Sequence, residues 1–252
     1  MTAQDPSPTR RPPAPRRAAE AGAADALVQI AEAVNTELRA RAVRVGAAAP
    51  MPLAPLSTGF PALDAATGSG GLPRGRITEL IGRPTSGRET VAARAVAASR
   101  GATAWVDVRG LVDVHYLERC GVDLDRLFIL RPPAPLDALA ITAQLVASRQ
   151  LETVVLDALA DLPPGGATAR AVEQLMRVVT PALGRTATVC LILSGPESNH
   201  PALAHAAAVR IALVKVGLIH QGGVFRGWRT RAKLLKPPGA PGNDPGLEVW
   251  LT

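Results

Sequence analysis

The segment from Gly82 to Thr90 contains the residue types that bind phosphate groups. It reads Gly-Arg-Pro-Thr-Ser-Gly-Arg-Glu-Thr, with glycines at Gly82 and Gly87. The segment Ile77–Ile81 before it, with sequence Ile-Thr-Glu-Leu-Ile, is a strand candidate, and Thr90–Ser99 after it has the pattern of a helix. In a strand, glycine loop and helix of this layout, backbone N–H groups surround a phosphate chain at the helix N-terminus. The glycine spacing is not specific by itself, so the flanking sequence has to decide.

The sequence on both sides of this loop resembles the RecA family of bacterial recombinases. The resemblance covers about Leu56 to Trp250, and its motifs follow one another in the order that the family shows. They are Thr58-Gly-Phe-Pro-Ala-Leu-Asp64 and Gly68-Ser-Gly-Gly-Leu-Pro-Arg-Gly-Arg-Ile-Thr-Glu-Leu-Ile-Gly82, then Asp107, Tyr116, Cys120-Gly-Val-Asp-Leu-Asp-Arg-Leu127 and Thr153-Val-Val-Leu-Asp157. The resemblance implies a degenerate nucleotide site at Gly82, Gly87, Arg88, Thr90 and Asp157.

The loop departs from the family at the two positions whose side chains bind the phosphates and the magnesium ion. The family has a lysine and then a threonine or serine after the second glycine, whereas this sequence has Arg88 and Glu89. The lysine contacts the β- and γ-phosphates and the hydroxyl binds magnesium. An arginine is bulkier and need not fit the same cradle, and Glu89 brings a carboxylate close to the phosphates. Thr90 would replace the hydroxyl only if the loop shifted by one residue.

The other positions that the family uses for hydrolysis have also changed. The glutamate that activates the attacking water lies two residues after the equivalent of Asp107, and Arg109, which cannot act as a general base, stands there. Gly195 after Ser194 occupies the place of a switch glutamine. Asp157 either holds magnesium through water or caps the following turn. We therefore expect no ATP turnover and no cofactor, with residual nucleotide binding left open.

The remaining candidate residues offer little chemistry. The four histidines have no partner arrangement for nucleophilic catalysis. Cys120 and Cys190 form neither a disulfide framework nor a zinc-ligand spacing, so we expect them to be small core residues and expect no metal site. The net charge of +7 favours nucleic acid or an acidic partner, although aromatic residues make up only 3% of the chain.

A basic segment near the C-terminus is a second candidate contact surface. Phe225–Lys236 interleaves basic and aromatic residues. On a strand, Trp228 and Thr230 would lie on one face, and Arg229 and Arg231 on the other. Such a row either follows phosphates or a protein partner, or it is a solvated sheet face whose charge discourages edge pairing. The candidate contact residues for DNA or a partner are Arg226, Trp228, Arg229, Arg231, Lys233 and Lys236.

The elements that must position these residues alternate along the chain. Predicted strands are Ile77–Gly82, Ala102–Val108, Leu127–Leu130, Thr153–Asp157 and Thr188–Leu193; predicted helices are Thr90–Ser99, Val112–Cys120, Leu136–Arg149 and Thr168–Leu183. Apolar strands that alternate with helices indicate an α/β fold, a mainly parallel sheet flanked by helices. The strands predicted after Ala206, which are Ala208–Gly217, Trp228–Leu235 and Leu247–Leu251, indicate an antiparallel C-terminal extension of this RecA-like core.

The N-terminal part has a different composition. Residues 1–18 are rich in proline and arginine and predict a disordered basic tail, residues 19–46 predict a helix, residues 47–55 a linker, and residues 56–252 the core domain. The helix carries Leu27, Ile30, Val34 and Leu38 near helical spacing, so it packs on its own domain or docks on a partner. No apolar run reaches the roughly 20 residues of a membrane span, and we expect a cytoplasmic location.

Two DNA-binding loops of the family are also reduced. The connections that correspond to them, Pro163–Gly166 and Gly195–Pro201, are short. The chain resembles the ImuA branch, whose members are RecA-related accessory proteins of damage-inducible mutagenesis. This resemblance implies a non-catalytic role in translesion DNA synthesis during the SOS response and an association with the nucleoid.

The implied partners are an ImuB-like inactive Y-family polymerase homologue, an error-prone replicative-type polymerase, RecA, DNA and a second copy of the chain. The alternatives are a DNA-dependent ATPase that uses Arg88, Thr90 and Asp157, and a DNA-binding protein of recombinational repair that needs no nucleotide.

Overall fold

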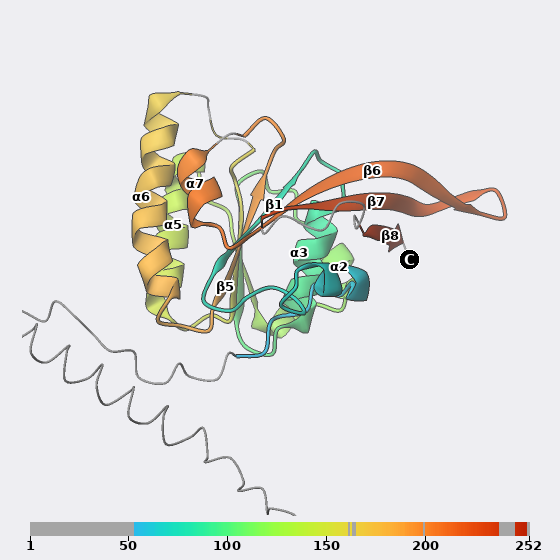
Figure 1. Ribbon diagram of the computed structural model, residues 1–252, viewed down its shortest axis with the longest axis horizontal. Helices are drawn as coiled ribbons and strands as arrows, with labels where there is room; N and C mark the ends of the chain where they lie inside the picture. The colour runs from blue at the N-terminus through green and yellow to red at the C-terminus, as the bar shows by residue number, and fades with distance from the viewer. Residues whose placement is uncertain (1–52, 161, 163–164, 199, 237–244, 251–252) are drawn as a thin grey trace, which may run out of the picture. The chain divides into compact units, whose positions relative to one another are not determined.

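Eight strands form one sheet in the part of the chain that the computed structural model describes, which is residues 53–160, 162, 165–198, 200–236 and 245–250. The strand order is β3-β2-β4-β5-β1-β6-β7-β8 (Figure 1). The strands are β1 (Ile77–Gly82), β2 (Thr103–Asp107), β3 (Leu127–Leu130), β4 (Thr153–Asp157), β5 (Val189–Ser194), β6 (Val209–Gln221), β7 (Val224–Lys236) and β8 (Gly246–Trp250). The tail at 1–18, the helix at 19–46 with Leu27, Ile30, Val34 and Leu38, and the first part of the linker lie outside the described residues.

The pairing of these strands confirms the predicted fold class. The five strand pairs β3–β2, β2–β4, β4–β5, β5–β1 and β1–β6 are parallel. The pairs β6–β7 and β7–β8 are antiparallel. All residues of β2, β4 and β5 are buried, as expected for parallel strands covered on both faces. The sheet is therefore the RecA-like architecture that the sequence pattern indicated, with an antiparallel extension at one side.

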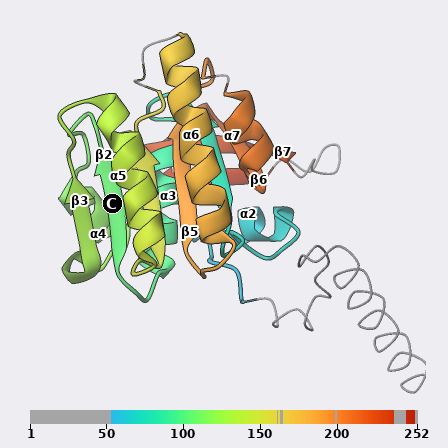
Figure 2. The same cartoon turned by 90° about the vertical axis from the view of Figure 1, so that its left-hand side faces the viewer.

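Helices cover both faces of the sheet (Figures 1 and 2). On one face, Val91 and Val96 of α3 (Arg88–Ala98) pack with Leu63 of α2 and Leu117 of α4 in one core cluster. On the other face, α5, α6 and α7 contribute to a second cluster. The bounds of these helices are α2 Pro61–Ala66, α4 Val114–Arg119, α5 Pro135–Ser148, α6 Gly166–Leu183 and α7 Pro201–Ala206. No helix within the described ranges is both long and apolar enough to cross a membrane.

A buried carboxylate ties the middle of the sheet together. Glu79 of β1 is 1% exposed and accepts a hydrogen bond from the Ser194 hydroxyl of β5 at 2.7 Å. Its other oxygen accepts from Nε of Arg210 in β6 at 2.5 Å. The three strands are adjacent, so this cluster satisfies a charge that would otherwise be costly to bury. It also fixes the position of Ser194, whose carbonyl belongs to the site described below.

The antiparallel hairpin is longer than the sequence predicted. Predicted strands end at Gly217 and begin again at Trp228, but β6 continues to Gln221 and β7 begins at Val224. Gly222 and Gly223 have φ values of 59° and 78°, so they form a tight turn that allows the strands to extend close to the tip. The intervening glycines and polar residues look like a loop in the sequence, which explains the error.

Gly82→Ala should destabilise the protein by about 1–3 kcal/mol, because a Cβ at this position overpacks the end of β1. The added atom would lie 2.2 Å from the Ser86 hydroxyl oxygen and 2.9 Å from the carbonyl oxygen of Leu213. Gly217→Ala in β6 is the matched control, since no described atom lies within 4 Å of its Cβ. Urea unfolding of both variants checks this, and equal free energies of unfolding would contradict it.

Candidate functional site

The loop from Gly82 to Arg88 joins the carboxyl end of β1 to the first turn of α3. Thr85 and Gly87 both have positive φ values, of 64° and 98°, and Gly87 is the residue that precedes the helix. The Thr230 hydroxyl of β7 donates to the carbonyl oxygen of Ser86 at 2.8 Å. The predicted strand, loop and helix arrangement is therefore present, and the hairpin holds the loop from the other side.

The Arg88 side chain is turned inward beneath this loop. It is 0% exposed, and its Nη1 atom donates to the carbonyl oxygens of Gly82 at 3.1 Å and Ser194 at 3.0 Å. Its Nε atom donates to Oε1 of Glu89 at 2.8 Å, and its Nη2 atom lies 3.7 Å from Oδ1 of Asp157. A guanidinium serves several acceptors at once because its donors point in fixed, divergent directions. Arg88 thus joins the carboxyl ends of β1, β5 and β4.

A second arginine completes a charge network around Asp157. Nη2 of Arg109 lies 3.6 Å from Oδ2 of Asp157 and 3.9 Å from Oε1 of Glu89. Two guanidinium groups and two carboxylates therefore alternate, and their formal charges cancel. Burial raises the pKa of the Asp157 carboxyl to about 6, against the opposing effects of Arg88 and Arg109. The network is compact and self-neutralising, which leaves little net field for a polyanion.

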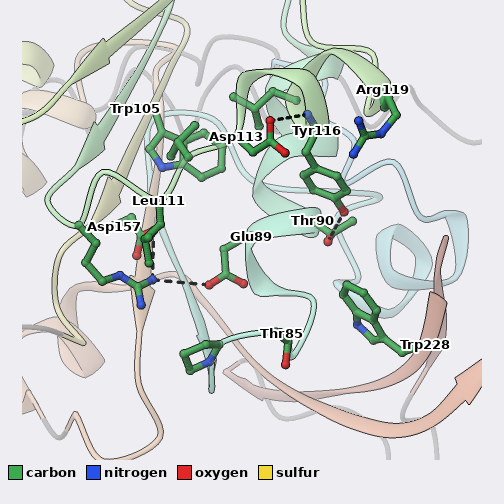
Figure 3. A pocket seen from close by; sticks show the side chains of 14 residues that line it. Thr85, Glu89, Thr90, Trp105, Leu111, Asp113, Tyr116, Arg119, Asp157 and Trp228 are labelled. Atoms are coloured by element: carbon green, nitrogen blue, oxygen red, sulfur yellow. Dashed lines mark hydrogen bonds and ion pairs between the residues drawn. The ribbon is translucent and has the colours of Figure 1, made fainter. Parts of the chain in front are cut away.

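A cavity of about 360 Å³ lies beside the loop, between α3, α4 and β7 (Figure 3). Trp105, Tyr116 and Trp228 form aromatic walls, and Glu89 and Asp157 lie at the side nearest the loop. The cavity is mainly apolar, and its charged lining residues are Glu89, Asp113, Asp157, Arg109 and Arg119. With both signs of charge among apolar walls, it has the composition of a small-molecule pocket and not that of a basic phosphate cradle.

Thr90 does not face the Arg88 network. Its hydroxyl lies 2.6 Å from the hydroxyl oxygen of Tyr116, across the mouth of the cavity (Figure 3). Burial raises the pKa of Tyr116 to about 12, so this phenol is neutral at physiological pH. The one-residue shift that would let Thr90 replace the missing magnesium hydroxyl is not present in this structure.

Several contacts of this site were beyond the sequence prediction. Arg88 contacts the carbonyl of Gly82 and lies 3.7 Å from Asp157, and Gly87 directly precedes α3. The carbonyl of Ser194 could not be recognised from residue type, because backbone acceptors carry no sequence signal. Arg109 stood out in the sequence only because it replaces the glutamate that activates water in the family. In the structure its guanidinium lies close to the carboxylates of Asp157 and Glu89. The buried setting of Cys120 and Cys190 agrees with core roles.

The basic segment divides between the two faces of β7. Thr230 and Ala232 are buried, whereas Arg229, Arg231 and Lys233 are exposed, as the predicted alternation requires. Other members of the set have different surroundings. Trp228 lines the cavity, and Lys236 donates to the carbonyl oxygens of Ala204 and His205 at 3.3 and 2.7 Å. Arg226 is exposed near the hairpin tip, and Arg229 lies 3.2 Å from Glu248.

Comparison with known proteins identifies relatives over most of the chain. A model of the RecA N-terminal domain family matches residues 24–194. The chain is 36% identical to protein RecA of Nocardia farcinica over 167 residues, which are 60% of this chain and 48% of that protein. It is 34% identical to protein RecA of Chlorobium chlorochromatii over 214 residues, which are 74% of this chain and 61% of that protein. The chain therefore spans about half of the length of these relatives.

Replacing Arg88 by Ala should cost about 3–5 kcal/mol of stability, since it leaves the carbonyls of Gly82 and Ser194 without their donor and removes one of the two cations beside buried Asp157. Arg83→Ala is the matched control in the same loop. Arg83 is 78% exposed and lies 3.5 Å from an exposed Glu197, so its loss should change stability by less than about 0.5 kcal/mol. Chemical denaturation of the two variants measures the contrast, and a mild effect of Arg88→Ala would contradict a structural role.

Asp157 should make stability depend on pH with a defined sign. Its pKa in the folded protein is about 6, above the ordinary value of 3.8. Between these two values the folded protein keeps a proton that the unfolded chain has lost, so stability falls as pH rises through this window. The unfolding free energy of the wild type minus that of Asp157→Asn should fall by a few kcal/mol from about pH 4 to about pH 7, at about 1.4 kcal/mol per pKa unit. A pH-independent difference in urea titrations would disprove it.

Proposed function

The chain belongs to the RecA family, and we propose that it is a non-catalytic member, an accessory protein of DNA damage tolerance that acts through contacts with other proteins. Its relatives are named as RecA, but the chain spans only 48% and 61% of the first two. The activity of those longer proteins is therefore not carried over as a whole. The proposal depends on the loop between β1 and α3.

The observation that carries the proposal is the position of the Arg88 guanidinium. In RecA-like proteins the lysine at this place contacts the phosphates of the nucleotide. Here the arginine is fully buried and donates to the carbonyls of Gly82 and Ser194 and to Glu89. A triphosphate would have to compete with these acceptors for donors that the fold already uses. This supports the proposal that the loop between β1 and α3 keeps the backbone course of a phosphate loop but no longer binds a nucleotide.

The surroundings of Arg88 support the same conclusion. Glu89 and Asp157 line the cavity and occupy the guanidinium groups of Arg88 and Arg109, which are therefore not free to bind phosphate oxygens. Arg109 stands where the family has the glutamate that activates water, and a guanidinium cannot accept that proton. The Thr90 hydroxyl lies against Tyr116. Apart from Asp157, the groups that the family uses for hydrolysis are thus replaced or turned away.

Within the family we propose the ImuA branch and a role in SOS mutagenesis by translesion synthesis. The proposed partners are an ImuB-like inactive polymerase homologue, an error-prone replicative-type polymerase and RecA itself. The connection between β5 and α7 supports this, because β5 ends at Ser194 and α7 begins at Pro201. So short a connection leaves little chain for the DNA-binding loop that strand exchange requires.

DNA binding without nucleotide is a second candidate function, favoured by one observation. Arg229, Arg231 and Lys233 are exposed on one face of β7. Such a row contacts phosphates in a salt-dependent manner and independently of sequence. It would coexist with the accessory role, since it does not use the loop.

The purified protein should not hydrolyse ATP in the presence of magnesium, with or without single-stranded DNA, above the rate of its Asp157→Ala variant. The double variant Arg88→Lys/Glu89→Thr, which restores the residues of the family, should bind a fluorescent ATP analogue more tightly than the wild type. Phosphate release and fluorescence anisotropy are the two measurements. Turnover by the wild type that Asp157→Ala abolishes would show a working ATPase and would overturn the proposal.

A further inference from the structure

Half of β6 has an unpaired edge. β1 pairs with β6 from Val209 to Leu213, where Gly82 is the last partner. β6 then continues to Gln221 and pairs with β7 on its other side. Among the described residues no strand pairs with Val214–Gln221 on the free side. Figure 1 shows the hairpin extending away from the rest of the sheet. Backbone N–H and C=O groups along such an edge are available to an added strand, in short stretches divided by the register shifts between Lys215 and Gly217 and between Ile219 and His220.

This edge carries aliphatic side chains that the fold does not bury. Val214, Val216 and Leu218 are 60%, 51% and 54% exposed. Val214 is paired with Arg231 and Leu218 with Trp228, so they do not belong to one face of the hairpin. The free stretch of β6 therefore carries an exposed aliphatic side chain on each of its faces, so a strand added along this edge would find apolar contacts on both sides.

The charge of the hairpin selects the kind of partner. Val209–Lys236 contains no Asp or Glu and has these basic residues: Arg210, Lys215, Arg226, Arg229, Arg231, Lys233 and Lys236. Arg210 and Arg229 are paired with Glu79 and Glu248. Lys215, on the free edge itself, forms no ion pair with any described residue. Like charges oppose pairing of this edge with a second copy and favour an acidic segment.

A groove begins where the free edge begins. A cavity of about 390 Å³ lies between the loop Gly82–Ser86, Pro196 and the β6 residues Ala212–Lys215. It is open at the point where β1 stops pairing with β6. An added strand would enter there in the place that β1 leaves, and its first side chains would contact Pro196 and Val214.

We propose that the edge Val214–Gln221 of β6 binds an acidic protein segment by adding it to the sheet as a further strand. Backbone hydrogen bonds supply affinity, and alternate side chains of the segment contact Val216 and Lys215. Exposed aliphatic residues and free backbone groups on this edge favour a protein segment, since aliphatic side chains do not bind the phosphates of a nucleic acid. This inference rests on the proposed accessory role, but its test uses no ATP, so the two fail separately.

The test uses a labelled synthetic peptide of alternating glutamate and valine with the full-length protein. Controls are a peptide with lysine in place of glutamate, a peptide with prolines that cannot form a strand, and a thymine oligonucleotide. The variants are Lys215→Glu and Val216→Glu; Val178→Glu, on the exposed face of α6, is the matched control. Fluorescence anisotropy measures binding, and hydrogen exchange measures protection of the backbone amides.

The expected result is binding of the acidic peptide alone among the peptides, weakened about tenfold by Lys215→Glu and by Val216→Glu but not by Val178→Glu. Amide exchange should slow within Val214–Gln221. The proposal is overturned if the acidic peptide does not bind at millimolar concentration, or if the proline peptide binds equally well. It is also overturned if Lys215→Glu and Val216→Glu weaken binding of the oligonucleotide but not of the acidic peptide, or if the free protein pairs with itself along this edge.

Discussion

The buried guanidinium of Arg88 is the constraint on which this end of the sheet depends. A charge that is 0% exposed has to be surrounded by acceptors, or the fold would not tolerate it. The acceptors are the carbonyls of Gly82 and Ser194 and the carboxylate of Glu89, while Asp157 lies at ion-pair distance, 3.7 Å from Nη2, without a hydrogen bond. They lie at the ends of three strands and in the first turn of α3. The loop therefore has to keep its strained turn at Thr85 and Gly87, because its backbone is held from within by Arg88 and from outside by Thr230.

This constraint also explains the electrostatics around the cavity. Asp157 is buried between two arginines, yet burial outweighs their effect and raises its pKa. The formal charges of the four side chains in the network cancel, and under the proposed function these side chains take the place of an external ligand. A family fold whose function elsewhere requires an open phosphate cradle can thus persist as a rigid platform. If the loop binds no nucleotide, the surfaces left for contacts with other molecules are the outer ones, including the β6–β7 hairpin.

The fold class was predictable from the sequence, because buried parallel strands are apolar segments that alternate with helices along the chain. The order of the strands in the sheet depends on crossovers that this pattern does not specify. The hairpin was underestimated, since the glycines near its tip resemble a loop until their turn geometry is known. The sequence indicated where the candidate site lies along the chain but not which hydrogen bonds its side chains form. Residue type alone showed that Arg88 replaces a lysine. It could not show that the guanidinium turns inward, because its main acceptors are backbone carbonyls, one of them 106 residues away. Trp228 was grouped with its basic neighbours, whereas strand alternation places it in the cavity wall.

The central claim is that Arg88 is hydrogen-bonded within the protein and does not bind a nucleotide. The most direct test is the NMR signal of the Arg88 side-chain Nε–H group. In the free protein its Nε–H should give a sharp signal with slow solvent exchange, identified by its loss in Arg88→Lys. Addition of magnesium and ATP should leave its chemical shift and exchange rate unchanged, because the group remains bonded to Glu89. A large shift of this signal on addition of ATP would show that Arg88 leaves its internal partners for phosphate. That result would contradict the central claim.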